Sequence, residues 1–178
     1  MSRKRTFAVF IPIVLAMVIV DRLTKSWAVA HLRMGKADYD LGFVDLTLVH
    51  NEGAAFGMGQ GSGAIFIAIA IVICACAIAW LAVRRKHGKL EVIALSLIVA
   101  GGIGNLIDRL TTGYVVDFIR FTFIDFPVFN VADICVTCGV VLFLVTVLVT
   151  DIFQSVQDTD LTDESARSSS NDADGAVR

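Results

Sequence analysis

"AIFIAIAIVICACAIAWLAV", residues 64–83, runs for twenty residues without a charged side chain. A helix needs about 20 residues to cross the hydrocarbon core of a bilayer. This stretch therefore predicts a transmembrane helix. The whole chain fits such an environment, because 56% of its 178 residues are hydrophobic and its mean hydropathy is +0.76, well above the usual values for soluble domains.

Three further apolar stretches lie on either side of this one, at about 7–30, 90–106 and 131–153. We therefore expect an all-α membrane protein with four transmembrane helices. Four spans leave only two modest loops and a tail outside the membrane. The sequence thus predicts one integral membrane domain, 1–153, in which any chemistry must lie in the helices and their loops.

The remaining segment, 154–178, differs sharply in composition. From Asp151 onward there are seven acidic and two basic residues, so this part carries about −5 and the rest of the chain about +3. The segment has almost no large apolar residues to offset the entropy lost on ordering. We expect an acidic, disordered, cytoplasmic tail.

Basic residues predict the orientation in the membrane. They cluster before the first stretch and between the second and third: Arg3, Lys4, Arg5, Arg84, Arg85, Lys86 and Lys89. The positive-inside rule places both clusters, and hence both termini, in the cytoplasm. The loops at 31–63 and 107–130 are then extracytoplasmic. The first stretch also resembles a cleavable signal peptide, but charged residues interrupt the approach to its "AVA" (28–30), so we expect it to be retained as a helix.

Polar residues collect at the predicted outward ends of the helices. Ionisable side chains are costly in membrane helices and usually mark function. A proton or ion pathway would distribute them across the membrane, whereas here they share one depth. Three clusters are involved: Asp21 with Lys25; Asn105 with Asp108 and Arg109; Asn130 with Asp133.

Each cluster also has a purely structural interpretation. Asn130 followed by Asp133 is typical of a capped helix N-terminus. Asp21 and Lys25, one turn apart, can form an ion pair, and Asp108 with Arg109 can be a structural pair or a headgroup anchor. The coincidence of three clusters at one depth favours a functional site.

Another carboxylate lies in the second outward loop. Asp117 stands in "GYVVDFIRF" (113–121), whose β-branched and aromatic residues predict a strand or an interfacial segment; "FVDLTLV" (43–49) predicts a short strand. Apolar neighbours should desolvate Asp117 and raise its pKa. If Asp117 and Asp133 converge, they can share one proton and serve as general base and general acid in peptide hydrolysis.

Other chemistries lack the residues they need. Cys135 and Cys138 have C-x-x-C spacing, but no histidine or further cysteine follows at ligand spacing, so we interpret them, like Cys74 and Cys76, as packing residues. The sequence has no H-E-x-x-H or G-x-S-x-G motif, and its glycine-rich loop lacks the Lys-Ser/Thr of a phosphate loop. We expect no metal, no cofactor and no nucleic-acid partner.

Five motifs in order resemble those of bacterial lipoprotein signal peptidase (signal peptidase II): "DRLTK" (21–25), "NEGAAF" (51–56), "GGIGNLIDR" (101–109), "VVDF" (115–118) and "FNVAD" (129–133). The resemblance runs from about residue 5 to 153. It implies an aspartic endopeptidase of the cell membrane that removes the signal peptide from diacylglyceryl-modified prolipoproteins by cleaving just before the lipidated cysteine. It also implies a small extracytoplasmic β-sheet and a short interfacial helix.

By position, the resemblance implies that Asp117 and Asp133 are the catalytic pair. The residues matched to its surroundings are Asp21, Lys25, Asn51, Asn105, Asp108, Arg109 and Asn130. The implied partners are diacylglyceryl-prolipoproteins, membrane lipid and globomycin-type inhibitors. Glu52 departs from the expected pattern by adding a carboxylate inside "NEGAAF".

Two other classes of function remain open on the residues alone. A small proton or cation transporter or channel subunit could use the acidic residues, although four spans are few and the polar groups lie at one face. A non-enzymatic assembly or headgroup-binding protein could use the charged clusters as anchors. This last class makes no demand for both carboxylates.

Overall fold

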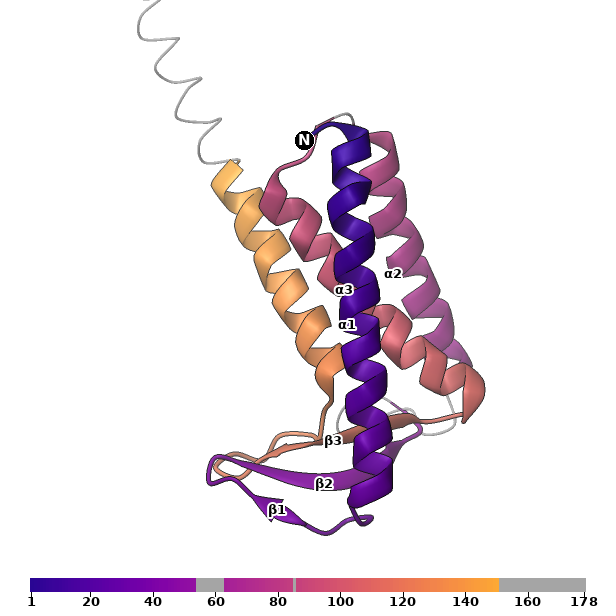
Figure 1. The fold of residues 1–178 in the computed structure, drawn as a ribbon, viewed down its shortest axis with the longest axis vertical. Coiled ribbons are helices and arrows are strands. Elements are labelled where there is room, and N and C mark those ends of the chain that lie inside the picture. The colour runs from indigo at the N-terminus through magenta and orange to yellow at the C-terminus, as the bar shows by residue number, and fades with distance from the viewer. Residues whose placement is uncertain (54–62, 85, 151–178) are drawn as a thin grey trace, which may run out of the picture. The chain divides into compact units, whose positions relative to one another are not determined.

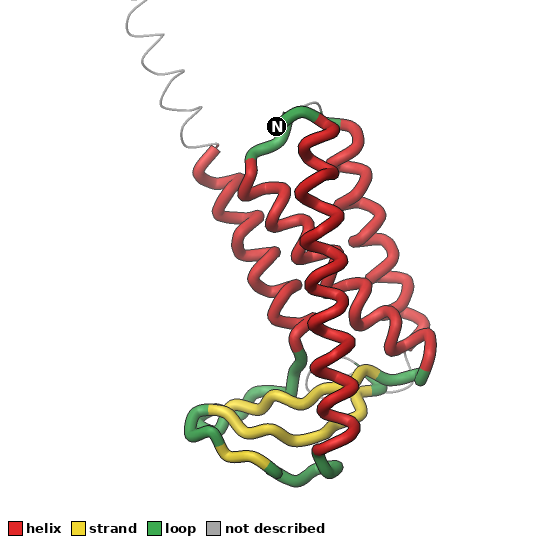
Figure 2. Tube along the Cα trace, viewed as in Figure 1, coloured by secondary structure: helices red, strands yellow, loops and turns green. Residues whose placement is uncertain are grey.

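The computed structural model describes residues 1–53, 63–84 and 86–150. Four long helices are present in this part of the chain: α1 (Arg3–His31), α2 (Gly63–Val83), α3 (Lys89–Thr111) and a fourth, Val131–Thr150. Each is long and apolar enough to cross a membrane, which confirms the predicted fold class (Figures 1 and 2).

The chain divides into two compact units, Met1–Leu142 and Phe143–Arg178. The first holds α1, α2, α3, the sheet and the beginning of the fourth helix. Of the second, the described residues are 143–150, the last part of that helix.

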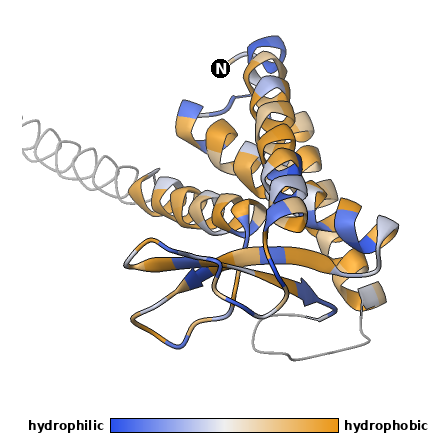
Figure 3. Ribbon diagram, turned by 60° about the horizontal axis from the view of Figure 1, so that its bottom comes forward, coloured by the Kyte–Doolittle hydropathy of each residue, from blue (hydrophilic) through white to orange (hydrophobic). Residues whose placement is uncertain are grey.

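Successive helices of the first unit run in opposite directions. The loops that follow α1 and α3 therefore emerge at the same end, where α2 and the fourth helix begin (Figure 1). α3 is the most buried of the four. Hydrophobic residues dominate the helices (Figure 3), and α1 and α2 expose many large apolar side chains. Such exposure fits a surface that faces lipid. The alternating directions of the helices bring their polar ends to one end of the bundle.

Small residues let α3 and the fourth helix approach closely. A Cβ atom at Gly101 would collide with the backbone oxygen of Ala132, and one at Gly139 would lie 2.8 Å from the backbone oxygen of Ala94. Close backbone approach through glycine is a common way of packing membrane helices. It places the start of the fourth helix directly against the end of α3.

A three-stranded antiparallel sheet, β1-β2-β3, lies at this end of the bundle. Its strands are β1 (Tyr39–Asp40), β2 (Val44–Asn51) and β3 (Val115–Phe121), so both predicted strands are confirmed. An irregularity in β2 between Leu46 and Val49 shifts the register, after which Val49 pairs with Asp117. Bulges of this kind re-aim side chains near functional sites.

One face of the sheet packs on the last turns of α1. Leu48, Val116 and Phe118 form an apolar cluster with Ala28 and Leu32 of α1. Because successive side chains of a strand point to opposite faces, the side chain of Asp117, between Val116 and Phe118, faces away from this cluster. The sheet is thereby held against α1, with the Asp117 carboxylate on the face that points away from α1.

Two predicted features fall outside the described residues. Within 1–53, 63–84 and 86–150 the four long helices are the only helices, so the short interfacial helix stays a prediction, as does the acidic tail at 154–178. Part of the "NEGAAF" motif also lies outside the described residues, because the description stops at Gly53 and resumes at Gly63.

Candidate active site

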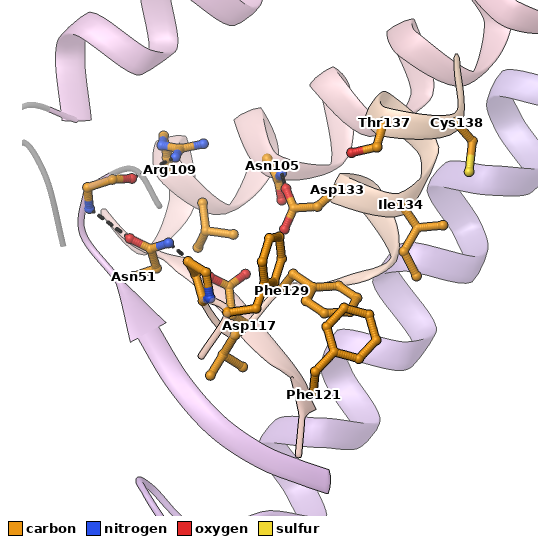
Figure 4. A pocket seen from close by; sticks show the side chains of 15 residues that line it. Asn51, Asn105, Arg109, Asp117, Phe121, Phe129, Asp133, Ile134, Thr137 and Cys138 are labelled. Atoms are coloured by element: carbon orange, nitrogen blue, oxygen red, sulfur yellow. Dashed lines mark hydrogen bonds between the residues drawn. The ribbon is translucent and has the colours of Figure 1, made fainter. Parts of the chain in front are cut away.

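Two carboxylates from different elements line one cavity. Asp117 comes from the middle of β3, and Asp133 from the first turn of the fourth helix (Figure 4). The cavity has a volume of about 450 Å³. Its lining residues are Asn51, Gly53, Asn105, Arg109, Val115, Asp117, Phe121, Phe126, Pro127, Val128, Phe129, Asp133, Ile134, Thr137 and Cys138.

Asp117 is almost completely buried and accepts two hydrogen bonds from asparagine side chains. The Nδ2 atom of Asn51 donates to Oδ2 at 2.9 Å, and that of Asn130 donates to Oδ1 at 2.6 Å. Burial, followed by the nearby charge of Asp133, raises the pKa of Asp117 to about 7, and the two asparagines oppose part of this shift. The expected rise in the pKa of Asp117 is confirmed.

Asp133 and Asn130 form a reciprocal cap at the start of the fourth helix. The Asp133 amide donates to Oδ1 of Asn130 at 3.0 Å, and the Asn130 amide donates to Oδ2 of Asp133 at 3.1 Å. This arrangement satisfies two backbone donors at a helix N-terminus. The capping interpretation is therefore correct, and it does not compete with a chemical role, because the same carboxylate faces the cavity.

Asn105 connects the carboxylate pair to α1. Its Nδ2 atom donates to Oδ1 of Asp133 at 2.7 Å, while its Oδ1 atom accepts from Lys25 Nζ at 2.8 Å and from Asn130 Nδ2 at 3.1 Å. The lysine fixes which end of the amide is the acceptor. Asn105 is therefore oriented to donate to Asp133.

A buried ion-pair network lies behind the asparagines. Lys25 Nζ is 3.1 Å from Asp21 and 2.8 Å from Asp108, and Arg22 is 2.5 Å from Asp108. Asp21 also accepts from the Ala132 amide at 3.1 Å. With two cations and two anions, the network is balanced in charge, and it holds α1, α3 and the fourth helix together.

Asp108 reaches β3 as well, because its Oδ2 atom accepts from the Val116 amide at 3.2 Å.

The predicted pairing of Asp21 with Lys25 is confirmed. The suggested pair of Asp108 with Arg109 is wrong: among the described residues, the ion-pair partners of Asp108 are Arg22 and Lys25. The guanidinium of Arg109 extends instead to the backbone oxygen of Gly53.

Arg109 instead points toward the cavity (Figure 4). Its Nη2 atom donates to the backbone oxygen of Gly53 at 3.1 Å, and its guanidinium lies 5.4 Å from the centre of the Phe66 ring. Arg109 thus brings a positive charge into the cavity that holds the two carboxylates. Glu52, the departure noted in the sequence, is exposed.

Sequence reasoning missed Arg22 as a member of the ion-pair network and missed the aromatic wall of the cavity. The Phe121 ring lies 5.0 Å from that of Phe129 and 5.8 Å from that of Phe126. The density of phenylalanine in "FIRFTFIDFPVF" (118–129) was the available signal. Arg22 stood inside the quoted "DRLTK", but nothing in its spacing indicated that it would reach Asp108.

The four cysteines differ in burial. Cys74 and Cys135 are buried, as a packing role requires, whereas Cys76 and Cys138 are exposed and Cys138 lines the cavity. Throughout the described ranges, no three histidine, cysteine, aspartate or glutamate residues are grouped so that they could hold a metal ion.

Comparison with known proteins gives one consistent result. A family model described as signal peptidase (SPase) II matches residues 13–149. A lipoprotein signal peptidase of Streptococcus pyogenes serotype M1 is 40% identical over 144 residues, covering 80% of this chain and 93% of that protein. One from serotype M5 (strain Manfredo) is 39% identical with the same coverage.

Two solved bacterial membrane enzyme structures, obtained by the in meso method at 2.3 and 1.9 Å resolution, have the same fold. Their TM-scores are 0.74 and 0.73, each with 34% sequence identity over 79% of this chain, and the matches cover 88% and 93% of those chains. From the family model, the relatives and the shared fold it follows that this chain belongs to the signal peptidase II family and is a multi-pass membrane peptidase.

Proposed function

We propose that this chain is an aspartic endopeptidase that removes the signal peptide from diacylglyceryl-modified prolipoproteins. It cleaves the peptide bond just before the lipidated cysteine, and Asp117 and Asp133 are its catalytic pair. The observation that carries this proposal is the placement of two carboxylates, one from β3 and one from the fourth helix, on a single cavity.

The reaction follows from how two neighbouring carboxylates titrate. They share one proton, because both cannot ionise comfortably at close range. The ionised member takes a proton from water as that water attacks the scissile carbonyl carbon, while the protonated member gives its proton to the carbonyl oxygen. When the C–N bond then breaks, the first carboxyl gives its proton to the leaving amine, and the second takes a proton back from a hydroxyl of the intermediate, which restores the shared proton.

The hydrogen bonds around the pair hold it in position for this exchange. Each of the four carboxylate oxygens accepts one bond from an asparagine: Asn51, Asn105, the side chain of Asn130 and its backbone amide. Each oxygen keeps a further lone pair for water or substrate. The carboxylates are thus fixed without losing their capacity to exchange protons.

The walls of the cavity suit a peptide that carries lipid. Its volume of about 450 Å³ falls in the range of ligand pockets, about 300–1,000 Å³. The carboxylates and Arg109 provide the polar side, where the arginine can stabilise negative charge developing on the carbonyl oxygen. Phe121, Phe126 and Phe129 provide an apolar side. A globomycin-type cyclic peptide would compete for this space.

The decisive experiment replaces each carboxylate by its near-isosteric amide. Asp117→Asn and Asp133→Asn should each lower cleavage of a diacylglyceryl-modified prolipoprotein peptide by at least about 10²–10⁴-fold, with the purified protein still folded. The amide oxygen introduced by Asp133→Asn can still accept the capping bond from the Asn130 backbone, so the helix start is kept. Processing is read from a gel shift of the peptide.

The matched control is Asp45→Asn, which changes a carboxylate of the same sheet that pairs with Arg120; it should retain activity. Normal cleavage by either the Asp117→Asn or the Asp133→Asn variant would refute the catalytic assignment. Because two carboxylates suffice for the chemistry, a chelator should leave the rate unchanged, and chelator-sensitive activity would also refute it.

A further inference from the structure

The sheet ends in an exposed apolar tip. Where β2 begins and β3 ends, Phe43 is 78% exposed, Phe123 is 63% exposed, and Leu41 and Ile124 are also exposed. We call residues 41–43 and 122–124 the sheet tip; it lies at the end of the sheet away from Asn51 (Figure 1). Large apolar side chains that are exposed next to one another are typical of a surface that contacts another apolar phase.

Hydrogen bonds join the two turns of the sheet tip. The Thr122 amide donates to the backbone oxygen of Phe43 at 3.2 Å, and its hydroxyl donates to that of Gly42 at 2.7 Å. The Phe43 and Phe123 rings meet edge to face with their centres 6.4 Å apart. The exposed side chains are therefore presented together by an ordered scaffold.

The sheet packs on Ala28 and Leu32, in the last turn and just after the end of α1. Trp27, directly before Ala28, is 40% exposed, and the centre of its ring lies 6.1 Å from that of Tyr39 on β1. Tryptophan and tyrosine are enriched where a bilayer meets water. The Trp27–Tyr39 pair, at the end of a helix long and apolar enough to cross a membrane, is therefore placed where interfacial aromatic residues are expected.

Polar groups adjoin the apolar side chains of the sheet tip. Asp45 pairs with Arg120 at 2.5 Å, and both line a second groove with Thr122 and Asp125 and with the tip residues Phe123 and Ile124. Apolar and charged side chains therefore lie next to one another at this end of the sheet, as they do in segments that lie in a membrane interface.

We propose that the sheet tip inserts into the interfacial region of the same bilayer that the helices cross. The lipid surface is its partner, and the sheet gains a second membrane attachment in addition to α1. The attachment is linked to the cavity: the Phe123 ring lies 5.5 Å from that of Phe121, which lines the cavity and packs 5.0 Å from that of Phe129. Insertion would hold the cavity at a fixed depth.

The test places a tryptophan at the tip of the full-length protein reconstituted in vesicles of phosphatidylcholine and phosphatidylglycerol. Phe43→Trp and Phe123→Trp are compared with Lys36→Trp, an exposed position in the loop between α1 and β1. The emission of the parent protein, which contains Trp27 and Trp80, is subtracted. Quenching by a lipid with a nitroxide near its headgroup is measured against quenching by aqueous iodide.

The added tryptophan of the two tip variants should be quenched by the labelled lipid and at least about threefold less by iodide than that of the Lys36→Trp variant. Iodide quenching equal to that of Lys36→Trp would overturn the proposal, because the tip would then lie in water. Protection from both quenchers would overturn it too, since it would indicate contact with protein, such as a second copy of the chain.

Discussion

Asn130 acts on both carboxylates of the pair at once. Its side chain donates to Asp117 and accepts from the Asp133 amide, and its own amide donates to Asp133. The side-chain amide supplies both the donor and the acceptor that these bonds require. An aspartate at this position would place a third negative charge beside the pair. The helix cap is therefore also the element that connects β3 to the fourth helix through the site.

The pH dependence of cleavage should follow the raised pKa of Asp117. The active form of the pair holds one proton, and burial together with the charge of Asp133 places the pKa of Asp117 at about 7. Above that pH the shared proton is lost, so kcat/KM should fall about tenfold per pH unit. A pH–rate profile with a lipidated peptide in detergent micelles measures this. A rate that stays flat to pH 9 would contradict it.

The Asn51→Ala variant tests whether the hydrogen bond to Asp117 sets the pH at which cleavage falls. The Asn51 hydrogen bond favours the charged form of Asp117, so its loss should raise the pKa of Asp117 further and move the alkaline fall in rate to higher pH. Asp45→Asn, at the other end of β2, is the control and should leave the alkaline fall in place. A shift toward lower pH in the Asn51→Ala variant would show that the bond does not act on Asp117 in this way.

Lys25 should contribute more to stability than its neighbour Arg22. The side chain of Lys25 is 3% exposed and contacts both Asp21 and Asp108, whereas that of Arg22 is 31% exposed. Lys25→Met would leave the two buried carboxylates with the more exposed Arg22 as their cation, and we expect it to lower the free energy of unfolding by about 3–5 kcal/mol. Arg22→Met should lower the free energy of unfolding by less, because water screens the ion pairs that Arg22 makes. Thermal unfolding of the two variants in detergent measures the difference. An equal loss of stability would show that Lys25 is not the more important cation of the network.

At the scale of elements, the contact between α3 and the fourth helix depends on the absence of side chains. Gly101→Ala would force its methyl group against the backbone of Ala132, which cannot move without displacing the helix that carries Asp133. We expect a loss of about 1–3 kcal/mol together with reduced cleavage. Thermal unfolding and the peptide assay measure the two effects.

Gly102→Ala provides the matched control for Gly101→Ala. Its added methyl group would meet only the Cys74 side chain, at 2.8 Å, and a side chain can adjust where a backbone cannot. Gly102→Ala should therefore cost less stability and leave cleavage close to normal. Equal losses of stability and cleavage in the two variants would show that the backbone contact at Gly101 matters no more to the helix packing than the side-chain contact at Gly102.

The sequence predicted the elements better than it predicted the contacts between them. Four apolar runs were sufficient to identify four helices, because helix formation in a bilayer follows from length and hydropathy. The alternation around Asp45 and the β-branched residues around Asp117 indicated the strands. The register irregularity in β2 was not predictable, since it depends on how β2 pairs with β3.

The candidate site was predictable to a similar degree. Most of its polar members stood out because they lay at the ends of apolar helices, where charge is costly. Asp117 stood out because apolar residues flank it, and Asn51 was identified through the resemblance alone. Arg22 and the phenylalanines of the aromatic wall were not distinguishable from ordinary interfacial and strand residues. Cys138 was interpreted as packing because no further metal ligand follows it at the required spacing; that it lines the cavity depends on which side of the fourth helix meets the cavity.

At the scale of the whole molecule, the alternating helices separate two kinds of surface. The end that carries the sheet holds the carboxylate pair, the ion-pair network and the cavity. The loop between α2 and α3 lies at the opposite end (Figure 1), and the basic cluster that includes Arg84, Lys86 and Lys89 surrounds it. This separation is what an enzyme needs if it acts on substrates after they have crossed the membrane.

The basic residues predict that the sheet end is extracytoplasmic and that both termini, including the acidic tail at 154–178, are cytoplasmic. Alkaline phosphatase, which needs disulfides and so folds only outside the reducing cytoplasm, distinguishes the two sides. Fused after Lys36, which follows α1, the phosphatase should be active in cells. Fused after Lys86, which follows α2, it should be at least about tenfold less active at equal expression. The reverse pattern would place the carboxylate pair on the cytoplasmic side, where it could not meet translocated prolipoproteins.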